Sequence, residues 1–316
     1  MTFGGGAVFG EMTMVRFDKP GAVVEYAGGR RTGAAREGRA AMAPSDLPQD
    51  VVLADTATKL GARAAGGVIV TGSHGGRYAA YLTLKVHPRA VIHNDAGVGK
   101  DEAGIAVVAM AQELGVAAAT ASHASCRIGD AADMMARGII SRANTVARAL
   151  GVTPGMGCRD AALRLLGAQA SGRDPPACEE ARRVLAEPGW RRRIVLIDSA
   201  SLIAPEDAGQ IIVTGSHGAL VGGSPAMALR VDGFAAVFSD AGVGAESAGI
   251  TRLPALDERG IAGLTVSAAS ARIGDAASIY GDGVISHANA TAQRLGARVG
   301  EPLQARLLAW ARAETS

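Results

Sequence analysis

The stretch TGSHG occupies Thr71–Gly75, and the same five residues recur at Thr214–Gly218. Each copy follows a run of β-branched residues, VIV at 68–70 and IIV at 211–213. Self-similarity within one chain is the sequence signature of a repeated structural unit. The chain is therefore expected to contain two copies of one unit, and the sequence around TGSHG decides how far each copy extends.

The similarity extends well beyond the pentapeptide. VVLADTA (51–57) aligns with IVLIDSA (194–200), and DAGVG (95–99) recurs at 240–244. SCRIGDAAD (125–133) aligns with SARIGDAAS (270–278), and the blocks keep the same order in both halves. We predict four segments: an N-terminal arm or cap (1–50), a first α/β repeat (51–168), a linker (169–193) and a second α/β repeat (194–316).

Each repeat shows alternating strand and helix patterns. Short apolar runs at 68–72, 90–95 and 116–122 favour strands, whereas 100–115 and 141–151 have helical spacing and end at glycine. Such alternation is typical of parallel strands joined by helical crossovers. We predict an α/β fold of two tandem homologous β-α units with mainly parallel strands and a pseudo-twofold relation. A further strand is expected at 22–26 and a further helix at 178–187.

Composition excludes several classes of partner. The chain of 316 residues has 32 basic and 30 acidic residues, so neither nucleic acid nor an anionic membrane is expected to bind it. No run of about 18 apolar residues and no secretory signal pattern occurs, which predicts a soluble cytoplasmic protein. Three cysteines without CxxC spacing favour neither a disulfide framework nor structural zinc. A homo-oligomer is left open.

The repeated loops follow predicted strands, at the edge where parallel α/β sheets bind ligands. A glycine-rich turn with a serine suits an anion, and histidine serves as acid or base near neutral pH. An aspartate at a strand end can orient such a histidine. The catalytic candidates are Ser73, His74, Asp95, Ser125, His217 and Asp240.

A second set of residues on the same loops is expected to bind substrate. Arginine suits a substrate carboxylate because its planar fork forms two parallel hydrogen bonds, although Arg127 and Asp130 also suit a structural ion pair. Asn144 and Asn289 also suit helix capping. The substrate-binding candidates are Gly72, Gly75, Lys100, Arg127, Asp130, Ser216, Ser270, Arg272, Asn144 and Asn289.

Neither a metal nor a cofactor is expected. The HxxxH and HExxH spacings are absent from the sequence. AGVGK (96–100) lacks the first glycine and the final Ser or Thr of a phosphate-binding loop, and Ala245 replaces Lys100 in the second copy. The expected partner is a small polar or anionic substrate.

Three hypotheses for function follow. The first is a cofactor-independent hydrolase of a small amide, cyclic amide or ester, with Ser73 or Ser125 as nucleophile, His74 as base and Asp95 as its orienting partner. The second is an isomerase, racemase or lyase in which His74 and His217 exchange a carbon-bound proton. Pseudo-symmetric α/β racemases resemble this plan in outline, but they use paired cysteines that this chain lacks at matched positions. The third is a non-catalytic binding protein for a small anion.

Overall fold

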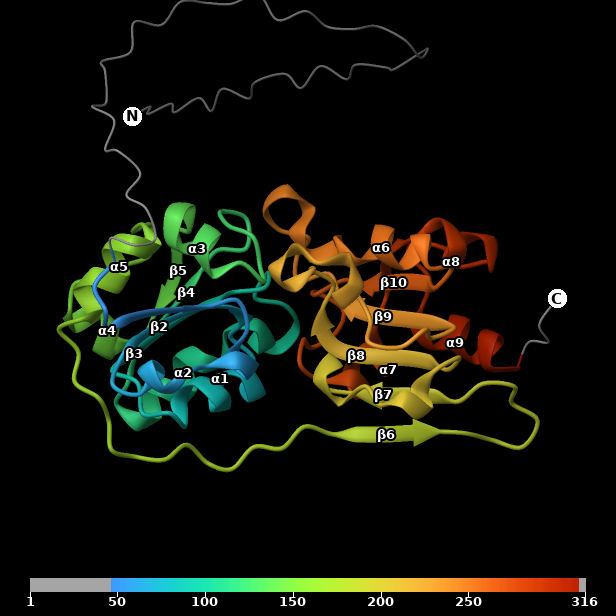
Figure 1. Ribbon diagram of the computed structural model, residues 1–316, viewed down its shortest axis with the longest axis horizontal. Coiled ribbons are helices and arrows are strands. Elements are labelled where there is room, and N and C mark those ends of the chain that lie inside the picture. Colours follow the sequence, from blue (N-terminus) through green and yellow to red (C-terminus); the bar gives the residue numbers. More distant parts are fainter. Residues whose placement is uncertain (1–46, 313–316) are drawn as a thin grey trace, which may run out of the picture. The chain divides into compact units, whose positions relative to one another are not determined.

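A computed structural model describes residues 47–312. The predicted arm with its strand at 22–26 lies outside the described residues. Within them, two separate sheets form, each with helices on both faces (Figure 1). The predicted α/β fold of two similar β-α units is confirmed.

The first sheet has the strand order β1-β2-β3-β4-β5. Strands β1 to β4 run parallel, and β5 is antiparallel to β4. A helix follows each of β2, β3, β4 and β5. The bounds are β1 Val51–Ala54, β2 Val68–His74, α1 Arg77–Leu84, β3 Ala90–Asn94, α2 Ala106–Leu114, β4 Ala117–Ala121, α3 Ala131–Arg137, β5 Ile140–Ala143, α4 Thr145–Ala149 and α5 Cys158–Leu165.

The second sheet repeats this plan and adds one edge strand, giving the order β11-β10-β9-β8-β7-β6. β7 to β10 are parallel, whereas β6 and β11 are antiparallel to their neighbours. The bounds are β6 Arg182–Leu185, β7 Ile194–Ile197, β8 Ile211–His217, β9 Ala235–Ser239, α6 Arg252–Glu258, β10 Ala262–Val266, α7 Ala276–Asp282, β11 Ile285–Ala288, α8 Ala290–Arg294 and α9 Leu303–Arg312.

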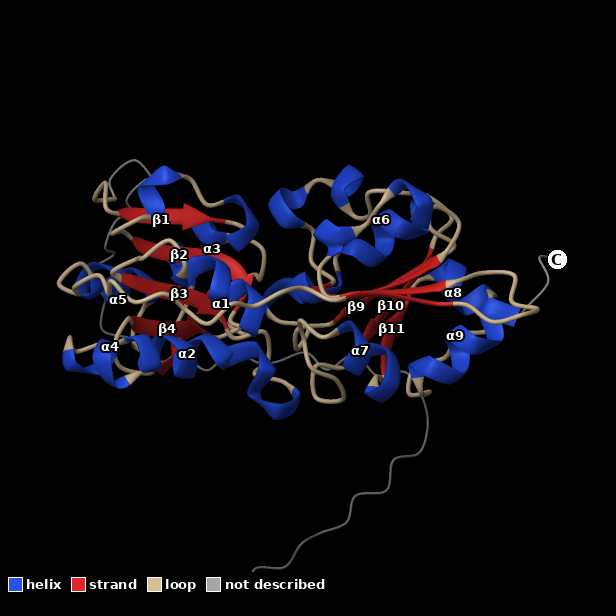
Figure 2. Ribbon diagram, turned by 90° about the horizontal axis from the view of Figure 1, so that it is seen from below, coloured by secondary structure: helices blue, strands red, loops and turns tan. Residues whose placement is uncertain are grey.

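Alternating side chains of the central strands bury both faces of each sheet. In β2, Ile69 packs with α1 and α2, while Val68 and Val70 pack with α3 and α5 on the other face. The second sheet is covered by α6 on one face and by α7, α8 and α9 on the other (Figure 2). Strands buried on both faces explain the continuous apolar runs that precede each TGSHG.

Three local predictions were wrong. β2 and β8 continue through the histidine of TGSHG, so the motif ends a strand and is not a separate turn. Residues 141–143 belong to β5, and only 145–149 are helical within the predicted helix 141–151. The predicted helix 178–187 contains strand β6, because pairing with β7 outweighs the local helical spacing.

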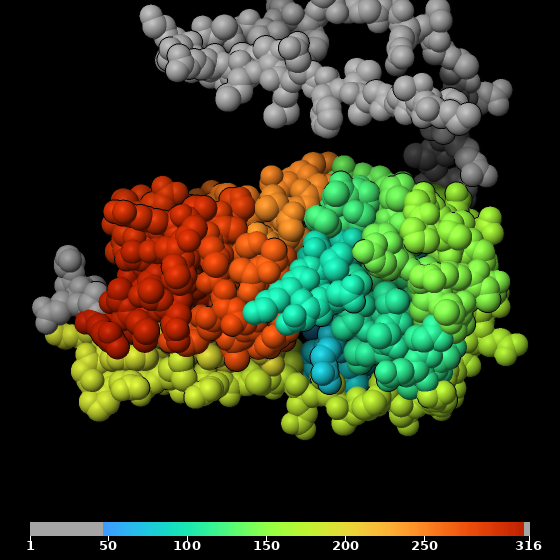
Figure 3. All heavy atoms as spheres, turned by 180° about the vertical axis from the view of Figure 1, so that it is seen from behind, coloured from blue at the N-terminus to red at the C-terminus, as the bar shows by residue number. Residues whose placement is uncertain are grey.

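The two units pack against each other (Figure 3), and loops that follow the parallel strands form matched hydrogen bonds between them. The Lys100 N–H donates to the Ala268 carbonyl at 2.8 Å, and the Ala245 N–H donates to the His123 carbonyl at 2.8 Å. At the centre, a Cβ added to Gly97 would lie 2.9 Å from the Gly242 Cα. The contacts therefore have approximate twofold symmetry.

Candidate functional site

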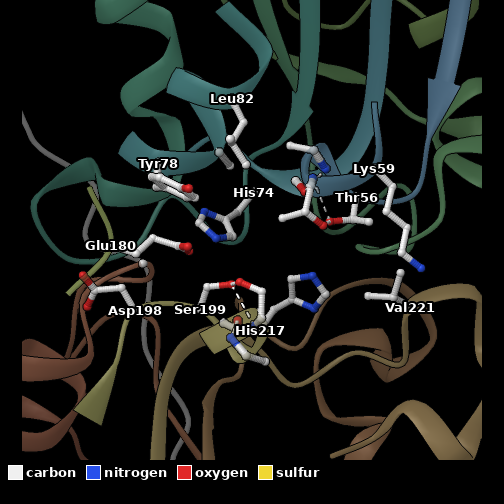
Figure 4. A pocket seen from close by; sticks show the side chains of 18 of the residues that line it. Thr56, Lys59, His74, Tyr78, Leu82, Glu180, Asp198, Ser199, His217 and Val221 are labelled. Atoms are coloured by element: carbon white, nitrogen blue, oxygen red, sulfur yellow. Dashed lines mark hydrogen bonds between the residues drawn. The ribbon is translucent and has the colours of Figure 1, made fainter. Parts of the chain in front are cut away.

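A cavity of about 190 Å³ lies between the two units at the ends of β2 and β8. His74 and His217 both line it, with their ring centres 6.5 Å apart and their planes nearly perpendicular (Figure 4). Each ring also packs near a glycine of the other unit: a Cβ on Gly274 would lie 3.4 Å from His74 Cε1, and one on Gly129 would lie 3.5 Å from His217 Cε1. The sequence repeat thus builds one shared cavity.

Backbone hydrogen bonds fix the tautomer of both histidines. The Gly76 N–H donates to His74 Nδ1 at 3.0 Å, and the Ala219 N–H donates to His217 Nδ1 at 3.3 Å. A neutral imidazole that accepts at Nδ1 carries its proton on Nε2. Neither Nε2 has a hydrogen-bond partner within residues 47–312. Every fully buried side-chain nitrogen or oxygen in that range does have a partner, so neither Nε2 is fully buried. Both Nε2–H groups are therefore accessible from the cavity.

The surroundings keep both rings neutral. Burial lowers the pKa of His74 to about 4. Burial, with Arg252 and His74 nearby, holds the pKa of His217 well below its ordinary value. A neutral Nε2–H donates a hydrogen bond but has no free lone pair at that nitrogen. The cavity therefore holds two fixed donors whose protons are available to an oxygen atom.

Hydroxyl groups of both units surround the histidines. Ser73 Oγ accepts from the Ala57 N–H at 2.9 Å, and Ser216 Oγ accepts from the Ala200 N–H at 3.0 Å. The turn after β1 adds two further hydroxyls, and the turn after β7 adds their counterparts. These cavity-lining residues are Thr56, Thr58, Ser199 and Ser201. Sequence analysis aligned DTA with DSA but did not select these residues, although the repeated pattern D-[ST]-A-[ST] was a usable signal.

The two ends of the cavity differ. Tyr78 and Glu180 line one end, and Val221 lies toward the other (Figure 4). After the histidine, the first unit continues into α1, which carries Tyr78, whereas the second unit forms short 3₁₀ turns at Val221–Gly223 and Pro225–Met227. His74 and His217 are therefore related by the repeat, whereas the residues at the two ends of the cavity are not.

Glu180 comes from the connecting segment between the units. Two hydrogen bonds hold the next residue, Ala181, against Asp198. The Ala181 N–H donates to Asp198 Oδ2 at 2.8 Å, and the Asp198 N–H donates to the Ala181 carbonyl at 3.1 Å. Burial raises the pKa of Glu180, and the Asp198 carboxylate adds to this rise, while the hydroxyls of Ser199 and Tyr78 oppose it. A partly buried carboxylate thus shares the cavity with the two imidazoles. Glu180 lies in the connecting segment, outside the repeated blocks, so a comparison of the blocks gave no signal for it.

The predicted Ser–His–Asp arrangement is not formed among the described residues. Asp95 Oδ1 accepts from the backbone N–H and Nδ1 of His123, at 2.9 and 2.8 Å, and not from His74. Burial pushes the pKa of Asp95 up, but the His123 groups outweigh it and hold that pKa below its ordinary value. Asp240 likewise accepts from the N–H groups of Gly242 and Ala268, each at 2.9 Å. Both aspartates stabilise interface loops outside the cavity.

The other candidates outside the cavity have structural contacts. Ser125 Oγ donates to the Ser122 carbonyl at 2.8 Å and accepts from the Ile139 N–H at 2.9 Å, and Ser270 repeats this pattern. Arg127 pairs with Asp130 at 3.0 Å and with Glu246 of the second unit at 2.7 Å.

The remaining candidates outside the cavity also have structural contacts. Arg272 pairs with Asp101 of the first unit, and Lys100 pairs with Asp282 of the second, each at 3.0 Å. Asn144 and Asn289 are the N-caps of α4 and α8, as their alternative interpretation predicted. Gly72 and Gly75 lie against backbone, where an added Cβ would come within 2.7 Å of Asp55 O and of Gly104 O. Of the predicted site residues, the cavity brings together Ser73, His74, Ser216 and His217.

Residues 47–312 contain no cluster of three metal-ligating side chains, and no helix there is long and apolar enough to cross a membrane. No protein-family model, curated protein or solved structure matches the chain.

Proposed function

We propose that this chain is an enzyme that forms and reprotonates an enolate-like intermediate on a small carbonyl compound, in the manner of an isomerase or lyase. The observation that carries the proposal is the pair of neutral Nε2–H groups of His74 and His217 in one cavity. Donors fixed in place at a site of developing negative charge are among the largest contributions to catalysis.

The two rings are close enough for one small molecule to contact both, with their centres 6.5 Å apart. The proposal places the carbonyl oxygen where both Nε2–H groups can donate to it, at the usual N–H···O length of about 2.9 Å. A neutral histidine whose lowered pKa makes it an electrophile is known from triosephosphate isomerase, where it works with a glutamate base. This role differs from the sequence-based hypothesis, which made His74 a base.

Glu180 is the proposed proton-transfer group. Its carboxylate takes a proton from the carbon next to the carbonyl, and the C–H electron pair becomes the new C=C bond. The carbonyl π pair moves to oxygen, where His74 and His217 each donate a hydrogen bond. The oxygen electron pair then re-forms the carbonyl, and the C=C pair takes the proton back from Glu180 at the same carbon. The raised pKa of Glu180 supports this exchange, because a base whose pKa lies nearer the working pH transfers protons more effectively.

Hydrolysis of a small amide or ester is the second candidate. The same two donors suit the oxyanion of a tetrahedral intermediate, with Glu180 activating water. The Ser73 hydroxyl accepts a backbone N–H and has no recorded bond to His74 among the described residues, so it is not assigned as nucleophile. A non-catalytic anion-binding protein is the third candidate.

Deuterium exchange tests the proposal before the natural substrate is known. Small 2-oxo and 3-oxo acids are incubated with the full chain in D₂O, and ¹H NMR follows the loss of the signal next to the carbonyl. The wild-type chain is expected to exchange at least one compound. Glu180→Gln should abolish exchange, and His74→Gln and His217→Gln should each lower it by roughly 10²–10³-fold.

The outcomes separate the three candidates. Amide or ester cleavage without carbon-bound exchange would replace the proposal by the hydrolase. Binding of an oxo acid with neither reaction would leave the binding protein. A large loss in only one of the two histidine variants would contradict the paired-donor role.

A further inference from the structure

Arg252 is a buried cation that lines the cavity. It is 6% exposed and begins α6. Its Nε donates to the Ala219 carbonyl at 2.9 Å and its Nη1 to the Ala228 carbonyl at 2.6 Å. Burial lowers its pKa to about 10, so it remains charged at neutral pH. Within residues 47–312, no carboxylate pairs with it, so its charge is not neutralised by the described protein.

The matched position of the first unit holds an apolar residue. Arg252 aligns with Val107 of the first unit, and the two residues hold matched backbone positions. The Val107 N–H donates to the Gly75 carbonyl and the Arg252 N–H to the Gly218 carbonyl, both at 2.8 Å. The valine is fully buried in the first core. Burying an unpaired charge costs several kcal/mol relative to an apolar side chain. Three loop carbonyls and the Phe238 ring, 4.8 Å from the guanidinium carbon, offset part of this cost in the second unit, but no carboxylate among residues 47–312 pairs with the charge.

One nitrogen of the guanidinium remains available. No described residue accepts a hydrogen bond from Nη2. Every fully buried side-chain nitrogen or oxygen among residues 47–312 has a partner, so Nη2 is not fully buried. Nη2 therefore reaches the cavity. Its charge also acts on His217, whose pKa it helps to lower. Arg252, His74 and His217 line the same cavity, so one ligand is within reach of all three.

We infer that Arg252 binds a carboxylate group of the substrate, so that the substrate is a short oxo acid with its carbonyl at the two histidines. This inference rests on the proposed function and names its substrate class. The cavity of about 190 Å³ sets the size. An engineered protein cavity of about 150 Å³ holds benzene, so this one suits a ligand of roughly six to eight non-hydrogen atoms. A short carboxylic acid fits that size.

Binding of malonate tests the inference. Isothermal titration calorimetry compares malonate, its uncharged analogue malonamide and inorganic phosphate on the full chain. The wild-type chain should bind malonate and not malonamide. Arg252→Met should weaken malonate on the order of 30-fold or more, because a buried charge pair loses one partner. Arg252→Lys, which keeps the charge but not the fork, should bind with intermediate affinity.

Arg259→Met is the matched control. Arg259 also holds the loop before β9, through the Leu229 and Val231 carbonyls, but it does not line the cavity. Malonate should bind this variant as it binds wild type. If Arg252→Met does not fold, the wild-type chain still gives an answer: ¹⁵N NMR should show the His217 Nε2–H signal move on addition of malonate and not of malonamide.

Several outcomes overturn the inference: equal malonate affinity in Arg252→Met, equal binding of malonamide, or binding of phosphate in place of malonate. The enzyme proposal can fail separately. If Arg252→Met loses malonate but the wild type exchanges no carbon-bound proton, the anion site remains and the enolate chemistry is wrong. If the wild type exchanges an oxo acid and Arg252→Met keeps its KM, the chemistry remains and the assignment of Arg252 is wrong.

Discussion

His93 bonds the backbone of His74 and differs from the two cavity histidines in its hydrogen bonds. Its Nδ1 donates to the His74 carbonyl at 3.1 Å, and its Nε2 lies 3.0 Å from Thr83 Oγ1. It is fully buried, and burial lowers its pKa to about 4. A residue without catalytic assignment thus supports the backbone of a proposed oxyanion donor.

This burial predicts a loss of stability in acid. The unfolded chain binds a proton at His93 as the pH falls below about 6.5, whereas the folded protein binds it only near pH 4. Acid therefore favours the unfolded state in that window. The free energy of unfolding should fall by about 1.4 kcal/mol per pH unit for each such histidine.

Urea unfolding between pH 7 and 4.5 measures how the free energy of unfolding depends on pH. His93→Gln should reduce that slope by the contribution of one histidine, about 1.4 kcal/mol per pH unit. An unchanged slope in that variant would mean that His93 is not held neutral. Stability that rises on acidification in the wild type would contradict the same point more directly.

At the scale of elements, β6 is the strand that local sequence did not reveal. It carries Arg182, whose guanidinium bonds both carboxylate oxygens of Asp207 at 2.8 and 3.0 Å. Burial would raise the pKa of Asp207, but Arg182 and the Ala204 N–H hold it below its ordinary value. The Asp207 side chain is 1% exposed, so this pair anchors β6, and Glu180 lies just before that strand.

Arg182→Met is therefore expected to act on both stability and the site. It leaves a buried carboxylate unpaired, which should lower the free energy of unfolding by about 3 kcal/mol. It should also lower the deuterium-exchange rate at a pH where the variant is still folded, because Glu180 loses its anchor.

Arg183→Met is the control, since Arg183 is exposed on the same strand. Urea unfolding and the exchange assay on both variants make the comparison. Equal effects of the two substitutions would show that the Arg182–Asp207 pair does not anchor the strand.

Sequence predicted the elements whose pattern is local. The runs VIV and IIV gave β2 and β8, and the duplicated TGSHG located His74 and His217. β6 was missed because its pairing with β7 is a long-range contact that residues 178–187 do not encode. Glu180 and Arg252 were missed for a related reason: a comparison of the repeats finds what the halves share. Arg252 replaces a valine of the first half, and Glu180 lies in the connecting segment, outside both repeats.

At the scale of the whole described part, Gly97 and Gly242 hold the two units together. Gly97 has φ of +75°, and an added Cβ would lie 2.9 Å from the Gly242 Cα. Two backbones meet there, so neither neighbour can move aside as a flexible side chain would. The spacing of the units, and with it the distance between the imidazoles, depends on this contact.

Gly97→Ala should consequently disrupt more than its own backbone conformation. Gly115→Ala is the matched control, because Gly115 has φ of +73° with nothing within 4 Å of an added Cβ. The control should cost about 1 kcal/mol, the penalty for a left-handed alanine. Gly97→Ala should cost at least about 3 kcal/mol, since overpacking adds to that penalty.

Urea unfolding of both variants tests this, with proton exchange measured in parallel. Similar stabilities for the two would mean that the units do not need close backbone contact at Gly97.

The crossed contacts between the two units have the form of an isologous interface, in which residue i meets residue j and j meets i. Two identical subunits joined in this way would carry every substitution twice. An arginine in place of Val107 would then enter both sides of the cavity, and two unpaired cations would repel each other. Covalent connection removes that constraint, because one half can change while its partner keeps the valine. Arg252 is such a one-sided feature, and Glu180 belongs to the connection itself. A ligand held between them has a preferred direction of binding that two identical halves cannot provide.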